Sequence, residues 1–206
     1  MTLFTFSLFI FVTLVYPTHL QPITLTSRTI LFSHFCSLIK RYGTEIDAIV
    51  LGEGELAFGE YIDRLTCGAD LTSVPSNIWL KKDGKVLKGS GVKMVKDLDE
   101  TPIPDRDLID HHLRSGLPGT SFITSRGCPY HCTYCHNPFL QDLYEGQGRY
   151  VRYRSIPGVI QEIKDALKRY PHIKEVAFSD DMFTAKQDRA KELCKAYKDE
   201  IGLPFV

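Results

Sequence analysis

At 206 residues the chain is long enough for one domain and part of a second, since a domain usually takes about 100–200 residues. Its 25 basic and 25 acidic residues balance, so the charge gives no sign of a nucleic-acid partner or of binding to a membrane surface. The apolar share of 43% is that of a soluble globular protein with a core. We therefore expect a cytoplasmic protein that binds no nucleic acid.

The segment Met1–Tyr16 is apolar and is stopped by Pro17. It lacks the basic start of a signal peptide, since the first basic residue is Arg28, and it is shorter than the about 20 residues that span a bilayer. Three interpretations stay open. Met1–Tyr16 is a signal peptide, or it is an anchor that gives weak membrane association through residues 1–16, or residues 1–40 are not native to the protein. We favour the third and expect membrane binding to be absent.

A strand, a turn and a helix follow from residue 45. Asp47–Leu51 predicts a buried strand of the parallel type, and Gly52–Glu55 (Gly-Glu-Gly-Glu) is a loop with acidic residues at a helix N-terminus, where the helix dipole favours them. The helix is expected to run to about Leu65. Phe58 and Ile62 recur with Leu65 at helical spacing and predict its apolar face.

A connector covers Leu71–Asp107. Asn77–Leu80 and Lys85–Leu87 flank Asp83-Gly84, which is a strong signal for a two-residue hairpin turn. Thr101–Asp105 is kept extended by its two prolines and predicts a domain boundary.

The most informative stretch is Ser125–His136, which follows a short apolar run, Thr120–Thr124, predicted to be a strand. It carries Cys128, Cys132 and Cys135 in a C-x-x-x-C-x-x-C array. Thiolates this close in sequence can turn toward one soft metal centre. An iron–sulfur cubane takes four thiolates, so three leave one iron open to a substrate or cofactor.

Two other roles are open to the three cysteines, as zinc ligands or in a disulfide. Zinc would recruit His131 or His136 as a fourth ligand and make a non-catalytic Cys₃His or redox module. A disulfide is weaker, because three clustered thiols cannot all pair and nothing else indicates secretion.

The cysteine spacing, the aromatic Tyr134 and the lead-in Ser125–Pro129 resemble the radical S-adenosylmethionine (SAM) family. The resemblance implies a 4Fe-4S cluster on Cys128, Cys132 and Cys135, with SAM bound to the open iron and split by one-electron reduction to a 5′-deoxyadenosyl radical. It also implies a one-electron donor such as a flavodoxin or ferredoxin, and a small-molecule or other substrate of unknown identity.

The strand–Gly52–Glu55–helix unit resembles the last unit of the Rossmann-like cobalamin-binding domain that precedes many radical SAM cores, and Pro102–Asp107 resembles the linker between them. The expected division is an N-terminal segment 1–44, a domain remnant 45–70, a linker with a hairpin 71–115, and the start of the core 116–206. Cobalamin itself is doubtful. The only near-match to the D-x-H-x-x-G ligand motif, Asp110–Gly116, places its glycine one residue late and lies after the unit that should end that domain.

The rest of the chain alternates helices and strands. Ser155 is expected to cap a helix with Pro157 in its first turn, Ile173–Phe178 is the second strand, and Thr184–Gln187 is a capping box that opens a second helix. Leu203–Val206 begins a third strand. Crossovers of this size imply parallel strands. The expected fold is therefore α/β, an incomplete (βα)₆ radical SAM partial barrel, and the sequence is expected to be a fragment with little or no complete catalysis of its own.

Further site residues follow from the resemblance. Tyr134 would lie beside the adenine of SAM, with simple packing as the alternative. Asp180 and Asp181 follow the second strand, where relatives bind the amino group or ribose of SAM; the alternative is a solvated acidic turn. Arg149–Arg154 interleaves arginine and tyrosine, as in some RNA-binding segments, but an exposed strand edge is favoured.

Overall fold

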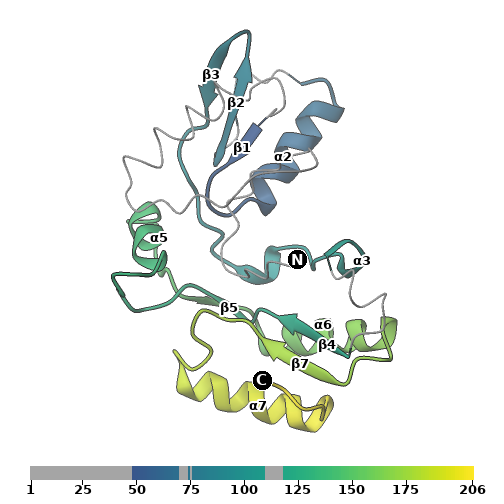
Figure 1. Cartoon of the computed structure of the whole chain (residues 1–206). Helices are drawn as coiled ribbons and strands as arrows, with labels where there is room; N and C mark the ends of the chain where they lie inside the picture. Colours follow the sequence, from purple (N-terminus) through teal and green to yellow (C-terminus); the bar gives the residue numbers. More distant parts are fainter. Residues whose placement is uncertain (1–47, 70–73, 75, 110–117) are drawn as a thin grey trace. The chain divides into compact units, whose positions relative to one another are not determined.

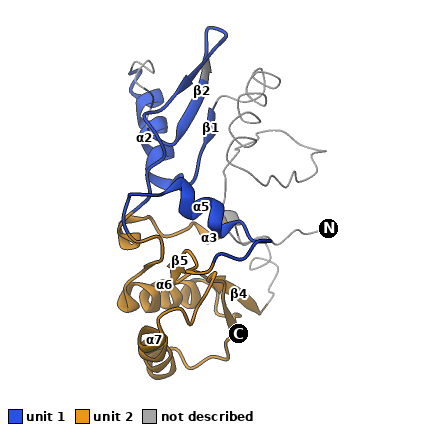
Figure 2. Ribbon diagram, turned by 90° about the vertical axis from the view of Figure 1, so that its left-hand side faces the viewer, with its two compact units in different colours: residues 1–95, 131–148 blue, residues 96–130, 149–206 orange. Residues whose placement is uncertain are grey.

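The computed structural model describes residues 48–69, 74, 76–109 and 118–206. The segment Met1–Tyr16 and the near-match Asp110–Gly116 lie outside the described residues. The chain forms two compact units: unit 1 holds residues 1–95 and 131–148, and unit 2 holds residues 96–130 and 149–206 (Figure 2). The helices of the described part include none that is both long enough and apolar enough to cross a membrane.

Unit 1 contains a three-stranded sheet in the order β1 (Ala48–Val50), β2 (Ile78–Lys82) and β3 (Lys85–Lys88), with helix α2 (Glu55–Thr66) after β1 (Figure 1). The predicted hairpin is confirmed. Asp83 and Gly84 both have positive φ, 50° and 73°, as a type I′ turn requires. This turn sets the register in which Lys82 pairs with Lys85.

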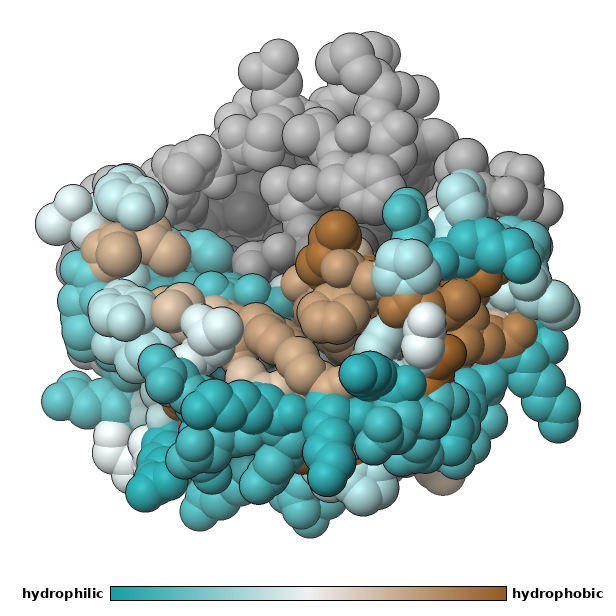
Figure 3. Space-filling model, turned by 90° about the horizontal axis from the view of Figure 1, so that it is seen from below, coloured by the Kyte–Doolittle hydropathy of each residue, from teal (hydrophilic) through white to brown (hydrophobic). Residues whose placement is uncertain are grey.

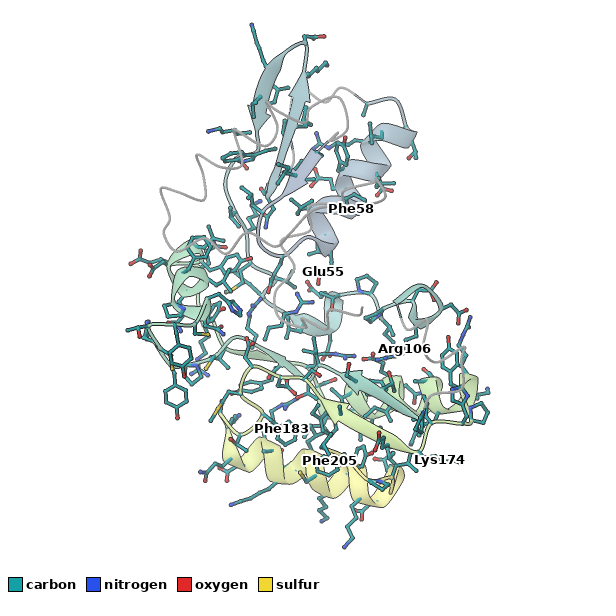
Figure 4. All side chains as sticks on the ribbon, in the orientation of Figure 1. Glu55, Phe58, Arg106, Lys174, Phe183 and Phe205 are labelled. Atoms are coloured by element: carbon teal, nitrogen blue, oxygen red, sulfur yellow. The ribbon has the colours of Figure 1, made fainter. Side chains whose placement is uncertain are left out.

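Two expectations about this unit were wrong. The described partner of β1 is β2, and the pairing is antiparallel instead of parallel. The predicted apolar face of α2 is not its buried face: Phe58, Ile62 and Leu65 are exposed, whereas Tyr61 is buried. Phe58 is labelled in Figure 4. The reason is packing, because Tyr61 sits in a cluster with strand residues of β1 and β2 and so fixes which side of the helix faces the sheet.

Helix α5 (Asn137–Leu143) was not predicted, because its segment was expected to be a polar connection. It belongs to unit 1 although it follows the cysteines in sequence. Pro138 lies in its first turn, where a missing N–H costs nothing, and Leu140 is buried to 1% exposure.

Unit 2 opens with a 3-10 turn, η1 (Leu98–Glu100), and a short helix, α3 (Arg106–Ile109). Strands β4 (Gly119–Phe122) and β7 (Glu175–Phe178) pair in parallel, and helix α6 (Ile156–Arg169) lies between them in sequence. Helix α7 (Gln187–Glu200) then leads to Phe205, which bridges Val176 in parallel. The predicted α/β fold with parallel strands, including the beginning of a third, is confirmed.

Apolar side chains of four elements form a buried core in this unit. It unites residues of β4, β7, α6 and α7: Phe122, Val159, Ile160, Ile163, Ala166, Val176, Leu193 and Tyr197. Phe183 and Phe205 both pack their rings on Phe178, at centroid distances of 5.2 and 5.3 Å (Figure 4). In the view from below, hydrophilic residues lie together along one side of the described part, and a band of hydrophobic residues lies beside them (Figure 3).

The two predicted helix starts had opposite outcomes. Ser155 caps α6 as predicted, since its Oγ accepts a hydrogen bond of 3.1 Å from the N–H of Gly158. The capping box at Thr184 was wrong: α7 begins at Gln187 after Lys186, which makes no side-chain cap. A one-turn loop, in which the N–H of Ala185 bonds to the carbonyl of Met182, occupies the predicted first turn.

Candidate functional site

The cysteine segment starts where the first parallel strand ends. After β4, the short strand β5 (Ser125–Arg126) pairs antiparallel with β6 (Arg152–Tyr153). Gly127 follows with a φ of 89°, and a Cβ at this position would lie 2.8 Å from the carbonyl oxygen of Tyr150. Only glycine fits this close approach, so the chain can turn directly into Cys128.

The three cysteines lie on both sides of the division between the units, so each part is described by itself. Cys128 is half-buried in unit 2. In unit 1, Cys132 is exposed and Cys135 is half-buried. None of the three forms a disulfide. Within the described residues, no group of three or more potential ligands is assembled for a metal ion, so the ligand set stays a prediction.

Within unit 1, Cys132 and Cys135 are joined by a turn in which the N–H of Cys135 donates to the carbonyl of Cys132 at 3.0 Å. The side-chain amide of Asn137 donates to Cys135 Sγ at 3.6 Å. Cysteine sulfurs are the ligands that an iron–sulfur cluster takes, and hydrogen-bond donors to the ligand sulfurs are part of such sites. The chemistry of this donor set therefore fits the cluster.

Tyr134 does not pack into the protein. Its side chain is 92% exposed, so the packing alternative was wrong. The charge of the neighbouring Cys132 thiolate is the main reason why the pKa of Tyr134 is raised. A role beside the adenine of SAM stays a prediction.

Asp180 joins the ends of the two parallel strands. Its Oδ1 accepts hydrogen bonds from the backbone N–H of Thr124 at 3.0 Å and from the hydroxyl of Ser125 at 2.5 Å. The Thr124 hydroxyl lies 3.2 Å from both carboxylate oxygens. Burial raises the pKa of Asp180, and the hydrogen bonds from Ser125 and Thr124 oppose that rise. Asp180 is thus engaged within unit 2. Asp181, the next residue of this loop, is exposed.

Arg189, on α7, completes this network and was missed in the sequence. Its guanidinium donates to the hydroxyl and carbonyl of Thr124 at 3.2 and 3.1 Å and to the carbonyl of Arg154 at 2.8 Å. Burial lowers the pKa of Arg189, and the charge of Asp180 opposes this. A signal was present: Arg189 lies on the same helical stripe as the buried Leu193, one turn away, where a charge needs a partner.

Arg152 and Arg154 do not lie on an exposed strand edge, so that expectation was wrong for them, whereas Arg149 is exposed. Arg152 is buried, and its Nε donates to the carbonyl of Tyr150 at 3.1 Å. Arg154 pairs with Glu162, which is 3% exposed and also accepts from Arg106 at 2.7 Å. Glu162 and Arg106 were missed as well; Arg106 is labelled in Figure 4.

No protein-family model matches the chain. Among curated proteins, the chain is 37% identical over 157 residues to an uncharacterized methyltransferase of Pyrococcus horikoshii, covering 75% of this chain and 32% of that protein. It is 28% identical over 196 residues to the cytidylyl-2-hydroxyethylphosphonate methyltransferase of Streptomyces wedmorensis, covering 78% and 34%. The chain thus spans about a third of the length of these relatives.

Solved structures share the fold. The radical SAM methyltransferase TsrM of Kitasatospora setae, with tryptophan and a SAM analogue bound, aligns with a TM-score of 0.53 at 17% identity, over 79% of this chain and 30% of that one. The cobalamin-dependent radical SAM enzyme OxsB, with aqua-cobalamin and SAM bound, aligns with a TM-score of 0.54 at 19% identity, over 80% and 24%. The expectation that cobalamin is doubtful gains no support from these relatives.

A cobalamin-dependent radical SAM methyltransferase of Streptomyces tokunonensis is also similar in sequence, at 31% identity over 97 residues, covering 44% of this chain and 14% of that protein. The cysteine motif, the parallel βα order and these relatives all indicate the same family. The chain therefore belongs, as a partial member, to the radical SAM family of the cobalamin-linked type.

Proposed function

We propose that this chain is the cluster-bearing part of a radical SAM enzyme, in which Cys128, Cys132 and Cys135 hold a 4Fe-4S cluster with one iron left open to SAM. The observation that carries the proposal is three thiols in C-x-x-x-C-x-x-C spacing directly after the first strand of a parallel α/β core, none of them in a disulfide. When bound, the cluster supplies the single electron that splits SAM.

The chain's own residues prepare the segment for this task. Gly127 permits the sharp turn before Cys128, and Asn137 directs an amide donor at the sulfur of Cys135. Donors to the sulfurs raise the reduction potential of a cluster, because they stabilise added negative charge. Arg126 lies two residues before Cys128 and adds a positive charge near the sulfur of Cys128 in sequence.

For SAM itself we propose Asp181 as the carboxylate that meets the amino group. Its neighbour Asp180 holds the strand ends together, because both of its oxygens lie within hydrogen-bond distance of the Thr124 hydroxyl and Oδ1 accepts from the Ser125 hydroxyl as well. Asp181 lies on the same loop and is exposed. A carboxylate suits an ammonium group. Tyr134, which is exposed on the surface, is proposed for stacking on the adenine.

Methyl transfer is the reaction class that we propose for the longer protein. Three curated relatives are described as methyltransferases, one of them as a cobalamin-dependent radical SAM methyltransferase of Streptomyces tokunonensis. A one-electron donor such as a flavodoxin or ferredoxin would supply the reducing electron, and cobalamin is a candidate carrier of the methyl group.

Metal content tests the cluster proposal directly. The 206-residue chain is reconstituted anaerobically with iron and sulfide, and iron, sulfide and zinc are then determined. We expect about four irons per chain, falling to background when Cys128, Cys132 or Cys135 is replaced by serine. Cys194→Ser, on α7, is the matched control and should keep the iron. Zinc bound in place of iron would contradict the proposal and favour a Cys₃His module.

A further inference from the structure

The Gly52–Glu55 turn is built into direct contact with the end of helix α5, inside unit 1. The hydroxyl of Tyr144, at the C-terminus of α5, accepts a hydrogen bond of 2.7 Å from the N–H of Glu53. A Cβ on Gly52 would lie 2.1 Å from the same hydroxyl oxygen, and Gly52 has a φ of 71°. The first glycine of the turn is therefore required twice, for its backbone conformation and for the space that Tyr144 occupies.

Glu53 and Asn77 hold the turn against the segment Val92–Val95. The Glu53 carboxylate is buried and accepts from the N–H of Val95 at 2.6 Å. The Asn77 side-chain amide donates to the carbonyls of Glu53 and Lys93 at 3.0 and 2.8 Å, and its oxygen accepts from the N–H of Lys93 at 2.7 Å. Asn77 has a φ of 66°, a conformation that such side-chain bonds help to sustain.

Gln147, which follows α5 in sequence, forms two hydrogen bonds with the segment Val92–Val95. Its Oε1 accepts from the N–H of Met94 at 2.9 Å, and its Nε2 donates to the carbonyl of Val92 at 2.7 Å. This two-point contact is what a neighbouring strand would make. Glu53, Asn77, Tyr144 and Gln147, which we call the GEGE clamp, thus bind one side of α5 to the turn and its neighbouring segment.

Helix α5 carries this contact back to the third cysteine. It begins at Asn137, directly after His136, and Asn137 donates to Cys135 Sγ at 3.6 Å. Leu140, in the middle of the helix, is 1% exposed, and the N–H of Tyr144 closes the helix by donating to its carbonyl at 3.1 Å. A short, packed helix moves as one piece, so its two ends cannot shift independently.

We propose that the GEGE clamp is a positioning device for the Cys132–Cys135 segment: it fixes α5 on the Gly52–Glu55 turn, so that a displacement of this turn shifts two of the three cysteines. The consequence for catalysis rests on the proposed function. If the cysteines hold a cluster, the domain before the core regulates that cluster through the clamp. Its structural content, the coupling of the turn to Cys135, can be measured without any cluster.

The experiment compares Tyr144→Phe with Tyr61→Phe in the full, cluster-free chain. Both variants delete the hydroxyl of a buried tyrosine of unit 1, but Tyr61 lies on α2. Hydrogen exchange and the alkylation rate of each cysteine are followed by mass spectrometry. Tyr144→Phe leaves the buried N–H of Glu53 without its acceptor, so we expect α5 amides to exchange about tenfold faster and Cys135 to be alkylated faster. Gly52→Ala should act in the same way, by displacing Tyr144.

The control decides whether the effect is specific. Tyr61→Phe should leave the α5 amides and Cys135 at wild-type rates, and helix α6 of unit 2 should be unchanged in all variants. Wild-type rates in Tyr144→Phe, or an equal acceleration of α5 in Tyr61→Phe, would overturn the proposal.

A second measurement separates positioning from mere stability. In the reconstituted proteins, Tyr144→Phe should shift the electron paramagnetic resonance spectrum of the reduced cluster, whereas Tyr61→Phe should not. An unchanged spectrum together with faster exchange would show that the clamp stabilises α5 without positioning a ligand, which would also overturn the proposal. Absence of a cluster in the wild type would refute the proposed function instead and leave the exchange result to decide the coupling.

Discussion

The hydroxyl of Ser125 donates a hydrogen bond of 2.5 Å to Oδ1 of Asp180, and this bond joins the first residue of the cysteine segment to the loop after β7. The same carboxylate oxygen accepts from the N–H of Thr124. Two strands that are far apart in sequence are therefore tied together at their carboxyl ends, which is the edge where α/β proteins carry out chemistry.

Replacing Ser125 by alanine should lower the free energy of unfolding by about 1–3 kcal/mol, because a half-buried carboxylate loses one of its donors. Equilibrium urea unfolding of the full chain measures the change. Ser179→Ala, which removes a hydroxyl from the residue next to Asp180, is the control and should stay close to wild type. Equal unfolding midpoints for the two variants would contradict the role of Ser125.

Asp180 should also make stability depend on pH. Burial raises its pKa in the folded protein above the ordinary value of 3.8, so the folded state prefers the protonated acid. The stability that this group contributes is fully present below pH 3.8 and is lost as the pH rises through the folded pKa. As the pH rises, the unfolding free energy of wild type should therefore fall relative to that of Asp180→Asn. Urea unfolding across the acidic range tests this, and a difference that stays flat or shifts the other way would refute it.

Glu162 should be among the costliest residues of unit 2 to remove. It is 3% exposed and pairs with Arg106 and Arg154, so Glu162→Ala leaves two partly buried guanidinium groups without their carboxylate. A loss of about 3–5 kcal/mol in unfolding free energy is expected. Glu200→Ala breaks an exposed pair with Lys164, a residue of the same helix as Glu162, and should cost at most about 1 kcal/mol. Similar losses in the two variants would contradict the claim that the buried pairs of Glu162 with Arg106 and Arg154 stabilise unit 2 more than an exposed pair does.

Asp181→Asn should weaken SAM binding by about tenfold or more, since a charge-assisted hydrogen bond to the ammonium group is lost. Isothermal titration of the reconstituted full chain with SAM measures the dissociation constant. Glu175→Gln, a carboxylate change at the opposite end of β7, is the control and should bind as wild type does. Unaltered affinity in Asp181→Asn would exclude the proposed contact.

The features that the sequence predicted well are those with local causes. The Asp83-Gly84 turn requires two positive φ values, and Ser155 offers an oxygen to the N–H of Gly158; both signals act over a few residues. The parallel order follows from the lengths of the crossovers. The spacing of the three cysteines likewise can be read directly from the sequence.

The features that the sequence did not predict depend on contacts between distant segments. Tyr61, instead of Phe58, faces the sheet because of its packing with β1 and β2, and Arg189 is tolerated on an apolar stripe because carbonyls of Thr124 and Arg154 converge on it. Tyr144 is bound to Glu53, 91 residues earlier in the chain. No local pattern encodes such partners.

The central claim is that the three cysteines hold a cluster with one iron open to SAM. Electron paramagnetic resonance of the reduced, reconstituted chain, recorded with and without SAM, tests it most directly. We predict the signal of a reduced 4Fe-4S cluster that changes when SAM is added. A cluster signal indifferent to SAM, or no cluster signal at all, would contradict the claim.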